Sequence, residues 1–108
     1  MYARVTTARF QPGAAREALD IFETKMLAAA RQHEGFRRAL VLQDGDQAII
    51  ITVWHAVADL EASAPPPNIM PFVERFGALI AEGEQHVYAV AGVFGGEATT
   101  PGEGAPGL

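Results

Sequence analysis

The spacing of apolar residues changes once in the first third of the chain, and it predicts a strand followed by a helix. Residues 2–10 (YARVTTARF) are rich in β-branched and aromatic side chains and end at QPG, a turn signal. From residue 14 to about residue 33, apolar side chains recur every three or four positions, which predicts a helix with one apolar face. These positions are Ala15, Leu19, Phe22, Met26 and Ala29. Gly35 is the expected end of this helix, because glycine adopts the left-handed capping conformation at little cost.

Two further strands are predicted on either side of Asp44–Gly45, a dipeptide typical of a tight hairpin turn. Their sequences are FRRALVLQ (36–43) and QAIIITVW (47–54). The second is apolar at nearly every position from Ala48 to Trp54. A strand that is apolar on both sides is expected to be covered on both faces of its sheet.

The sequence after Trp54 predicts a short helix, a rigid connection, a longer helix and a final strand. The short helix lies in HAVADLEAS (55–63), and the proline-rich APPPN (64–68) follows it. Asn68 is the expected N-cap of a helix within IMPFVERFGALIAEG (69–83). HVYAVAGVF (86–94) is the expected last strand.

The resulting order, β-α-β-β-α-β, is that of the ferredoxin-like fold, an α+β architecture in which two helices cover one face of a four-stranded antiparallel sheet. The other sheet face would carry the outward side of residues 48–54, and an apolar face of that size is an aggregation hazard in water. We therefore expect a homodimer packed sheet to sheet, which forms a dimeric α+β barrel. The domain is expected over residues 1–94, and a flexible Gly/Pro-rich tail over residues 95–108.

Composition narrows the classes of function. The chain has 108 residues, which fits one domain, and its net charge of −5 argues against binding nucleic acid through a basic surface. It contains no cysteine, so thiolate metal sites and cysteine nucleophiles are excluded. No stretch is apolar enough to cross a membrane, and the N-terminal arginines do not fit a signal peptide. We expect a cytoplasmic protein.

The predicted hairpin brings possible ligand-binding groups together. A two-residue turn at Asp44–Gly45 would pair Thr52 with Arg37, and a three-residue loop would pair Thr52 with Arg38. In both registers an arginine lies opposite Thr52 on the face that carries Trp54. A cation, a hydroxyl and an indole on one face can recognise an anionic or phenolic ligand.

The same polar residues also have purely structural interpretations. The arginine opposite Thr52 can instead pair with a helix carboxylate such as Glu23 or Glu34. A strand of eight residues spans roughly 26 Å, which keeps His55 and His86 too far apart to share a metal ion. No metal site is expected, and the chain has no phosphate loop, nucleophile elbow or dinucleotide-binding motif.

The segment HEGFRRALVLQDGDQAIIITVWHAVADLEAS (33–63), together with the order of elements, resembles the antibiotic biosynthesis monooxygenase domain of the dimeric α+β barrel superfamily. The likeness rests on Gly35–Phe36 opening a strand, on an apolar strand ending in Trp54, and on ADLEAS after it. It covers residues 2 to about 94. The resemblance implies a homodimer with a pocket in each protomer between sheet and helices. It also implies oxidation of phenolic or quinol-type substrates by molecular oxygen without a cofactor.

In that resemblance Trp54 forms a wall of the pocket, while Arg37 or Arg38 and Thr52 polarise the substrate oxygen. The other residues expected to contact a small aromatic or apolar ligand are Tyr88, Thr6, Phe22, Phe72 and Phe76.

The resemblance leaves more than one function open. Haem-degrading relatives combine a strand-one asparagine, this tryptophan and a histidine on the following helix. Here the first strand has Thr6 and Thr7 instead, and residues 56–83 contain no histidine, so haem cleavage by that route is not expected. Two functions remain: a cofactor-independent monooxygenase, or a non-catalytic ligand-binding or stress-related dimer.

Overall fold

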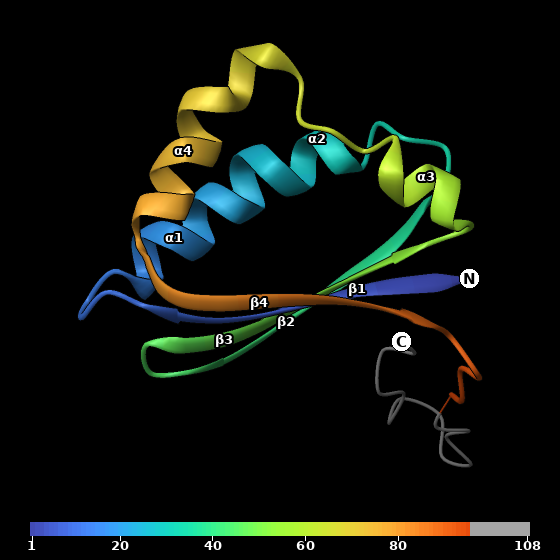
Figure 1. Cartoon of the computed structure of the whole chain (residues 1–108), viewed down its shortest axis with the longest axis horizontal. Helices are drawn as coiled ribbons and strands as arrows, with labels where there is room; N and C mark the ends of the chain where they lie inside the picture. Colours follow the sequence, from blue (N-terminus) through green and yellow to red (C-terminus); the bar gives the residue numbers. More distant parts are fainter. Residues whose placement is uncertain (96–108) are drawn as a thin grey trace, which may run out of the picture.

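The computed structural model describes residues 1–95 and has two layers, an antiparallel sheet and a layer of helices on one of its faces (Figure 1). The strands are β1 (Tyr2–Phe10), β2 (Phe36–Asp44), β3 (Gln47–Trp54) and β4 (Ile80–Ala89). Their order across the sheet is β2-β3-β1-β4, and each neighbouring pair is antiparallel. The predicted α+β, ferredoxin-like fold is confirmed.

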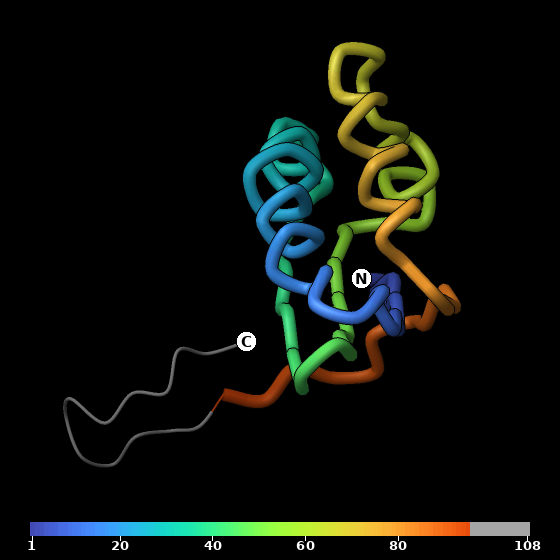
Figure 2. The backbone as a smooth tube through the Cα atoms, turned by 90° about the vertical axis from the view of Figure 1, so that its left-hand side faces the viewer, coloured from blue at the N-terminus to red at the C-terminus, as the bar shows by residue number. Residues whose placement is uncertain are grey.

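Two helical segments lie side by side over the sheet (Figure 2). The helical elements are α1 (Ala15–Ile21), the π-helical η1 (Phe22–Leu27), α2 (Ala28–Ala30), α3 (Val57–Glu61), the 3₁₀ turn η2 (Pro67–Ile69) and α4 (Met70–Ala78). The first three run on as one segment beside α4, while α3 covers the end of the sheet near the N-terminus. Within residues 1–95, no helix combines the length and apolar character that a bilayer crossing requires.

The hydrophobic core fills the space between the helices and the half of the sheet nearest Phe10. The Phe10 ring meets the Phe76 ring edge to face with centroids 6.1 Å apart, and Phe22 contacts Phe76 at 6.5 Å. The buried cluster comprises Ala8, Phe10, Ala15, Ala18, Ile21, Phe22, Ala48, Ile50, Phe76 and Leu79. Trp54 lies outside this cluster, at the other end of the sheet. The two ends of the sheet therefore have different packing environments.

A paired ion contact holds α4 against α1. The Arg75 guanidinium donates from Nε and Nη2 to the two Glu17 carboxylate oxygens, at 2.7 and 2.9 Å. This two-point contact holds the pKa of the Glu17 carboxyl below its usual range. Because both side chains are exposed, the pair orients the helices more than it stabilises the fold.

The end of the last helix and the bounds of the last strand were predicted wrongly. α4 ends at Ala78 rather than near Gly83, and β4 runs from Ile80 to Ala89 rather than over 86–94. β4 is an edge strand that pairs with nine residues of β1, and this ladder overrides the helical pattern of its first residues. Asn68 lies inside η2 and does not cap α4. Residues 96–108 of the predicted tail lie outside the described residues.

Gly35 has a different role from the one predicted. Its φ is not positive, so it is not a left-handed helix cap. It is buried, and a β-carbon there would overlap the Asp59 carboxyl group. That carboxylate accepts a hydrogen bond from the Ala56 backbone N–H at 3.1 Å and so caps the start of α3. The Gly35 carbonyl also accepts from the His55 N–H at 2.7 Å. The absence of a side chain at Gly35 thus leaves room for the Asp59 carboxylate that caps α3, which begins three residues after Trp54.

We predict that Gly35→Ala destabilises the protein by about 2 kcal/mol, because the new methyl group displaces Asp59 from its capping position. Urea unfolding measures this directly. Gly77→Ala is the matched control, since Gly77 lies exposed in α4 with no atom near its missing β-carbon. That control should be neutral or up to about 1 kcal/mol more stable. Equal effects of the two substitutions would contradict the steric role of Gly35.

Candidate functional site

Alternate residues of the four strands form rows across the helix-covered face of the sheet. Tyr2 pairs with Trp54, and Arg4 pairs with Thr52. The next row pairs Thr6 with Ile50 on one side and with Gln85 on the other. Because side chains alternate between the faces of a strand, paired residues lie on the same face. The pairing therefore brings a set of polar residues beside Trp54.

Neither predicted arginine lies opposite Thr52. The hairpin turn is Gly45–Asp46, one residue later than predicted, so that Thr52 pairs with Ala39. A bulge at Arg37 then restores the pairing of Phe36 with Trp54. Arg37 is exposed, and its Nη1 donates to the Glu34 carbonyl at 2.8 Å. Arg38 pairs with Val53, whose side chain points away from the helices.

The turn is placed by two contacts that a hairpin motif does not reveal. Gly45 has φ 61° and occupies the first central position of the turn, which type II′ turns reserve for glycine. Asp46 then accepts hydrogen bonds from the last residue of β1 and from the loop that follows it. Its carbonyl accepts from the Phe10 N–H at 2.7 Å, and its carboxylate from the Gly13 N–H at 3.2 Å. These tertiary contacts select the register of β2 against β3.

Arg4 is the cation that stands opposite Thr52. It is half-buried on β1, and its Nη2 donates to the Leu60 carbonyl of α3 at 3.4 Å. Desolvation by this partial burial lowers the pKa of the Arg4 guanidinium, which still stays charged at neutral pH. The predicted combination of cation, hydroxyl and indole is therefore present on one face, but the cation comes from β1.

Trp54 forms a rigid wall at this end of the sheet. Its side chain is 2% exposed, and its indole Nε1–H donates to the Thr52 hydroxyl at 3.1 Å. The Phe36 ring packs edge-on against it at 5.3 Å, and the His33 ring at 6.1 Å. With its one donor satisfied and rings on its flank, Trp54 is held in a fixed position and is almost completely covered by protein.

The helix-covered face is incompletely covered between Trp54 and the core. Thr6 lies on a central strand and faces the helices, but it is only half-buried, and its neighbour Gln85 is exposed. Val87, which pairs with Arg4, is 50% exposed. Neighbouring positions of the sheet carry small residues: Ala8, Ala39, Gly83 and Ala89. Thr6 and Gln85 therefore keep contact with solvent on the β4 side of the sheet.

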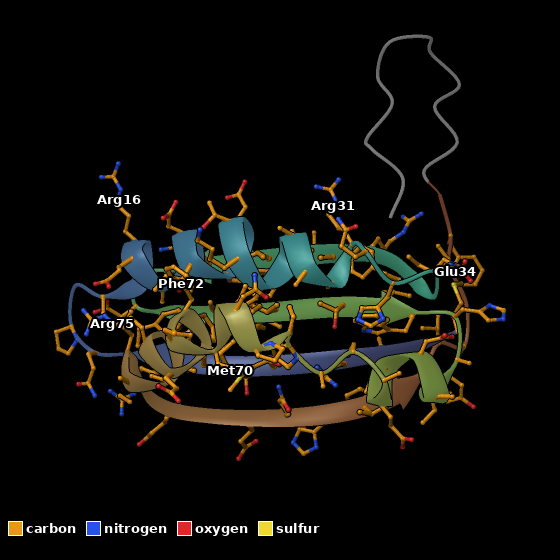
Figure 3. The ribbon with its side chains drawn as sticks, turned by 90° about the horizontal axis from the view of Figure 1, so that it is seen from above. Arg16, Arg31, Glu34, Met70, Phe72 and Arg75 are labelled. Atoms are coloured by element: carbon orange, nitrogen blue, oxygen red, sulfur yellow. The ribbon has the colours of Figure 1, made fainter. Side chains whose placement is uncertain are left out.

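The remaining predicted residues lie in three different places. Phe22 and Phe76 belong to the buried core rather than to this polar group. Phe72 lies on the side of α4 toward the α1–η1 segment (Figure 3), 38% exposed, with the Lys25 ammonium 4.6 Å from its ring centroid. Tyr88 pairs with Ala3 on the face away from the helices and is 56% exposed. The structure thus groups Trp54, Thr52 and Thr6, and it separates Tyr88 from them.

A separate hollow of about 780 Å³ lies on the open face of the sheet, away from the helices. Leu42 and Ile49 line it together with the ion pair between Arg9 and Glu82, whose charged atoms are 3.1 Å apart. Within residues 1–95, no three His, Cys, Asp or Glu side chains gather closely enough to hold a metal ion.

Solved structures of other proteins share this fold, whereas neither a family model nor a curated protein matches the sequence. One is a variant of SnoaB, a cofactor-independent oxygenase from Streptomyces nogalater, with a TM-score of 0.73 and 19% identity over 84% of this chain and 93% of that chain. Another is a candidate antibiotic biosynthesis monooxygenase from Nitrosomonas europaea, with a TM-score of 0.73 and 15% identity over 84% and 99% of the two chains. A third, from Chloroflexus aurantiacus and described in the same way, has a TM-score of 0.71 and 24% identity over 87% and 96%. At these identities the likeness establishes the fold.

Sequence reasoning missed Arg4 and Gln85. The alternation Tyr2, Arg4, Thr6 along β1 places these side chains on one face, and that signal was readable from the sequence. Gln85 had no such signal, because the sequence pattern placed it outside the last strand.

We predict that Thr52→Val destabilises the protein by about 1–3 kcal/mol, because it leaves the buried Trp54 indole N–H without an acceptor. Urea unfolding followed by the fluorescence of the single tryptophan reports both the stability and the polarity around Trp54. Thr7→Val, on the opposite face of β1 and exposed, is the control and should change stability by less than about 0.5 kcal/mol. A neutral Thr52→Val would mean that another group accepts the indole proton.

Proposed function

We propose that this chain, which has the fold of the antibiotic biosynthesis monooxygenases, oxidises a small phenolic or quinol-type aromatic compound with molecular oxygen and without a cofactor. The observation that carries the proposal is the polar group of Arg4, Thr6 and Gln85 on the helix-covered face beside the Trp54 wall. It supplies what such a substrate needs, an aromatic surface and donors for its oxygen.

The proposed role of the residues is to bind and orient the ionised substrate. Arg4 lies where its positive charge favours the phenolate form, and Thr6 and Gln85 donate hydrogen bonds to the same oxygen. The aromatic ring packs against Trp54, in the role the sequence predicted for that residue. Arg4 takes the role that was predicted for Arg37 or Arg38.

The reaction then follows from the electron-rich phenolate. One electron passes from the phenolate to molecular oxygen, and the resulting radical and superoxide combine, with a proton, as a hydroperoxide on a ring carbon. The hydrogen of that carbon and the outer hydroxyl of the peroxide leave as water. One oxygen atom remains as the new carbonyl of the quinone product.

A second function, binding without chemistry, is favoured by one observation. Trp54, against which the oxygenase proposal packs the substrate ring, is 2% exposed and its indole N–H is bound by Thr52, which favours a structural role for this residue. A ligand that is retained by the protein while no oxygen is consumed would identify this function.

We further propose a homodimer formed through the open face of the sheet. Pairing places the following apolar side chains on that face: Val5, Leu40, Leu42, Ile49, Ile51 and Val53. In the single chain Leu42 is 46% exposed and Ile49 37%. A second copy packed on this face would cover the apolar group and the hollow beside it.

We predict oxygen uptake above the uncatalysed rate with hydroquinones or anthrone-like phenols. One molecule of O2 should be consumed for each molecule of quinone formed. An oxygen electrode and the quinone absorbance measure this ratio. Thr6→Leu should lower kcat/KM at least about tenfold, because it removes a donor and fills the site. Thr7→Leu, the adjacent residue on the other face, should keep wild-type turnover. Absence of uptake with the whole panel would exclude the oxygenase for these substrates.

We predict that Ile49→Asp converts the dimer to a monomer, since the carboxylate would be buried against the partner sheet. Val41→Asp is the control: Val41 is 40% exposed, but it pairs with Ile50 on the helix-covered side. Sedimentation velocity should find a dimer for the wild type and for the control. A monomeric wild-type protein would contradict the proposed interface.

A further inference from the structure

The chain that follows β4 carries apolar side chains that its own fold leaves in solvent. After the end of β4, the Val90 N–H donates to the Met1 carbonyl at 2.9 Å, and the next residues lie outside the sheet. We call residues 90–94 (VAGVF) the apolar arm. Within it, Phe94 is 89% exposed and Val93 49%. Phe94 is the most exposed of the large apolar side chains in residues 1–95, and neighbouring apolar side chains exposed to this degree indicate a contact surface.

The hollow of about 780 Å³ on the open face of the sheet has the composition of a pocket for such a side chain. Leu42 and Ile49 contribute its apolar lining. Arg9, Asp44 and Glu82 contribute polar groups around them. Aromatic side chains that anchor an interface fill pockets of this kind, with an apolar centre and polar surroundings.

The apolar arm and the hollow lie at opposite ends of the same face. Residues after β4 pass to the side of the sheet away from the helices and run across its end (Figure 1 and Figure 3). Ala89, where β4 ends, pairs with Tyr2, whereas Ala8 lines the hollow. Tyr2 and Ala8 are roughly 20 Å apart along β1. Because the arm runs across the strands rather than back along them, a second copy is needed to bring a hollow to it.

Charge distinguishes two ways in which a two-fold axis can lay the open faces together with their strands aligned. If the axis is parallel to the strands, the same ends of both sheets meet. Asp44 and Glu82, which lie at the hollow end on the two edge strands, would then face each other across the interface. If the axis is perpendicular to the strands, the hollow end meets the partner's other end, where Arg38 lies. Asp44 then faces a cation instead of an acid, which favours the perpendicular axis.

The apolar side chains favour the same arrangement. On the open face, β4 contributes Glu84 and His86. The apolar residues of that face lie mainly on β2 and β3: Leu40, Leu42, Ile49, Ile51 and Val53. A perpendicular axis lays β2 and β3 on the same two strands of the partner, so that apolar side chains meet. A parallel axis would lay them on the half of the partner sheet that carries Glu84, and would bury its charge against them.

We propose that the apolar arm of each copy crosses the hollow of its partner and seats the Phe94 ring in it. The perpendicular axis lays the end of the sheet from which the arm leaves over the hollow end of the other copy. This inference rests on the homodimer proposed above, and it adds the orientation of the two copies and a residue that enters the partner. The two-fold axis makes the contact twice in each dimer.

The experiment is chemical crosslinking between introduced cysteines, since the chain has none of its own. Gly95→Cys leaves the preceding Phe94 intact, and Gln47→Cys lies in the lining of the hollow. With a short bismaleimide, the full-length protein that carries both substitutions should give a covalent dimer on a denaturing gel. The matched pair, Asp44→Cys with Glu82→Cys, comes together across the interface only about a parallel axis, so it should give no covalent dimer.

The contribution of the ring is measured with Phe94→Ala. The substitution should leave the fold intact, because the side chain is 89% exposed in the single chain. It should raise the dimer dissociation constant at least about a hundredfold, since each of the two buried rings contributes about tenfold or more. Sedimentation velocity over a dilution series gives this constant. Phe72→Ala, the same change on α4 in the helix layer, should keep the wild-type value.

A covalent dimer through the Gly95 and Gln47 positions, with a weakened Phe94→Ala dimer, would support the proposal. A wild-type dimer that Phe94→Ala leaves unchanged, or one that crosslinks through the Asp44 and Glu82 positions, would overturn it while the homodimer stands. A crosslink confined to single chains would place the arm on its own sheet and contradict the exchange. A monomeric wild-type protein would overturn the homodimer as well. Oxygen uptake is measured separately, so failure of the oxygenase is distinguished from all of these results.

Discussion

The pairing of β1 with β3 is the constraint on which the candidate site depends. It sets Arg4 opposite Thr52 and Tyr2 opposite Trp54, so that a charged residue near the N-terminus lies on the face that the helices cover. A shift of one residue would turn Arg4 to the open face and Ala3 or Val5 toward Thr52. Loss of this register would separate the cation from the indole, although both strands would remain in the sheet.

The helix layer divides the covered face into a packed half and an open half. Near Phe10, large side chains from α1, η1 and α4 meet over small residues of the strands. Near Trp54, α3 lies at the end of the sheet and the α1–η1–α2 segment lies above β2 and β3, and polar side chains on β1 and β4 keep contact with solvent (Figure 3). The packed half supplies rigidity, and the proposed ligand site lies in the more exposed half.

The two faces of the sheet carry different chemistry, and that separates the proposed activity from the proposed assembly. Polar donors and the indole lie under the helices, whereas the opposite face is largely apolar along β2 and β3. Tyr88 belongs to the second face, so its phenol lies on the side of the proposed dimer contact rather than in the site. Substitutions on one face can therefore test one proposal without disturbing the other.

The sequence by itself determined the order of elements, the buried strand that ends in Trp54 and the apolar second face of the sheet, because these follow from local periodicity and composition. Its prediction that Arg37 or Arg38 lies opposite Thr52 was wrong, because Thr52 pairs with Ala39 on β2 and with Arg4 on β1. Which arginine lies opposite Thr52 was decided only by tertiary structure. Because Asp46 binds the end of β1 and the loop after it, the hairpin turn lies one residue later than predicted. A bulge at Arg37 then leaves neither hairpin arginine opposite Thr52. The place of Gln85 was also decided only by tertiary structure. It lies on the exposed edge strand β4, whose sequence has no periodic pattern, and β4 forms because β1 provides its pairing partner. Register between strands distant in sequence depends on such contacts, and local pattern does not encode them.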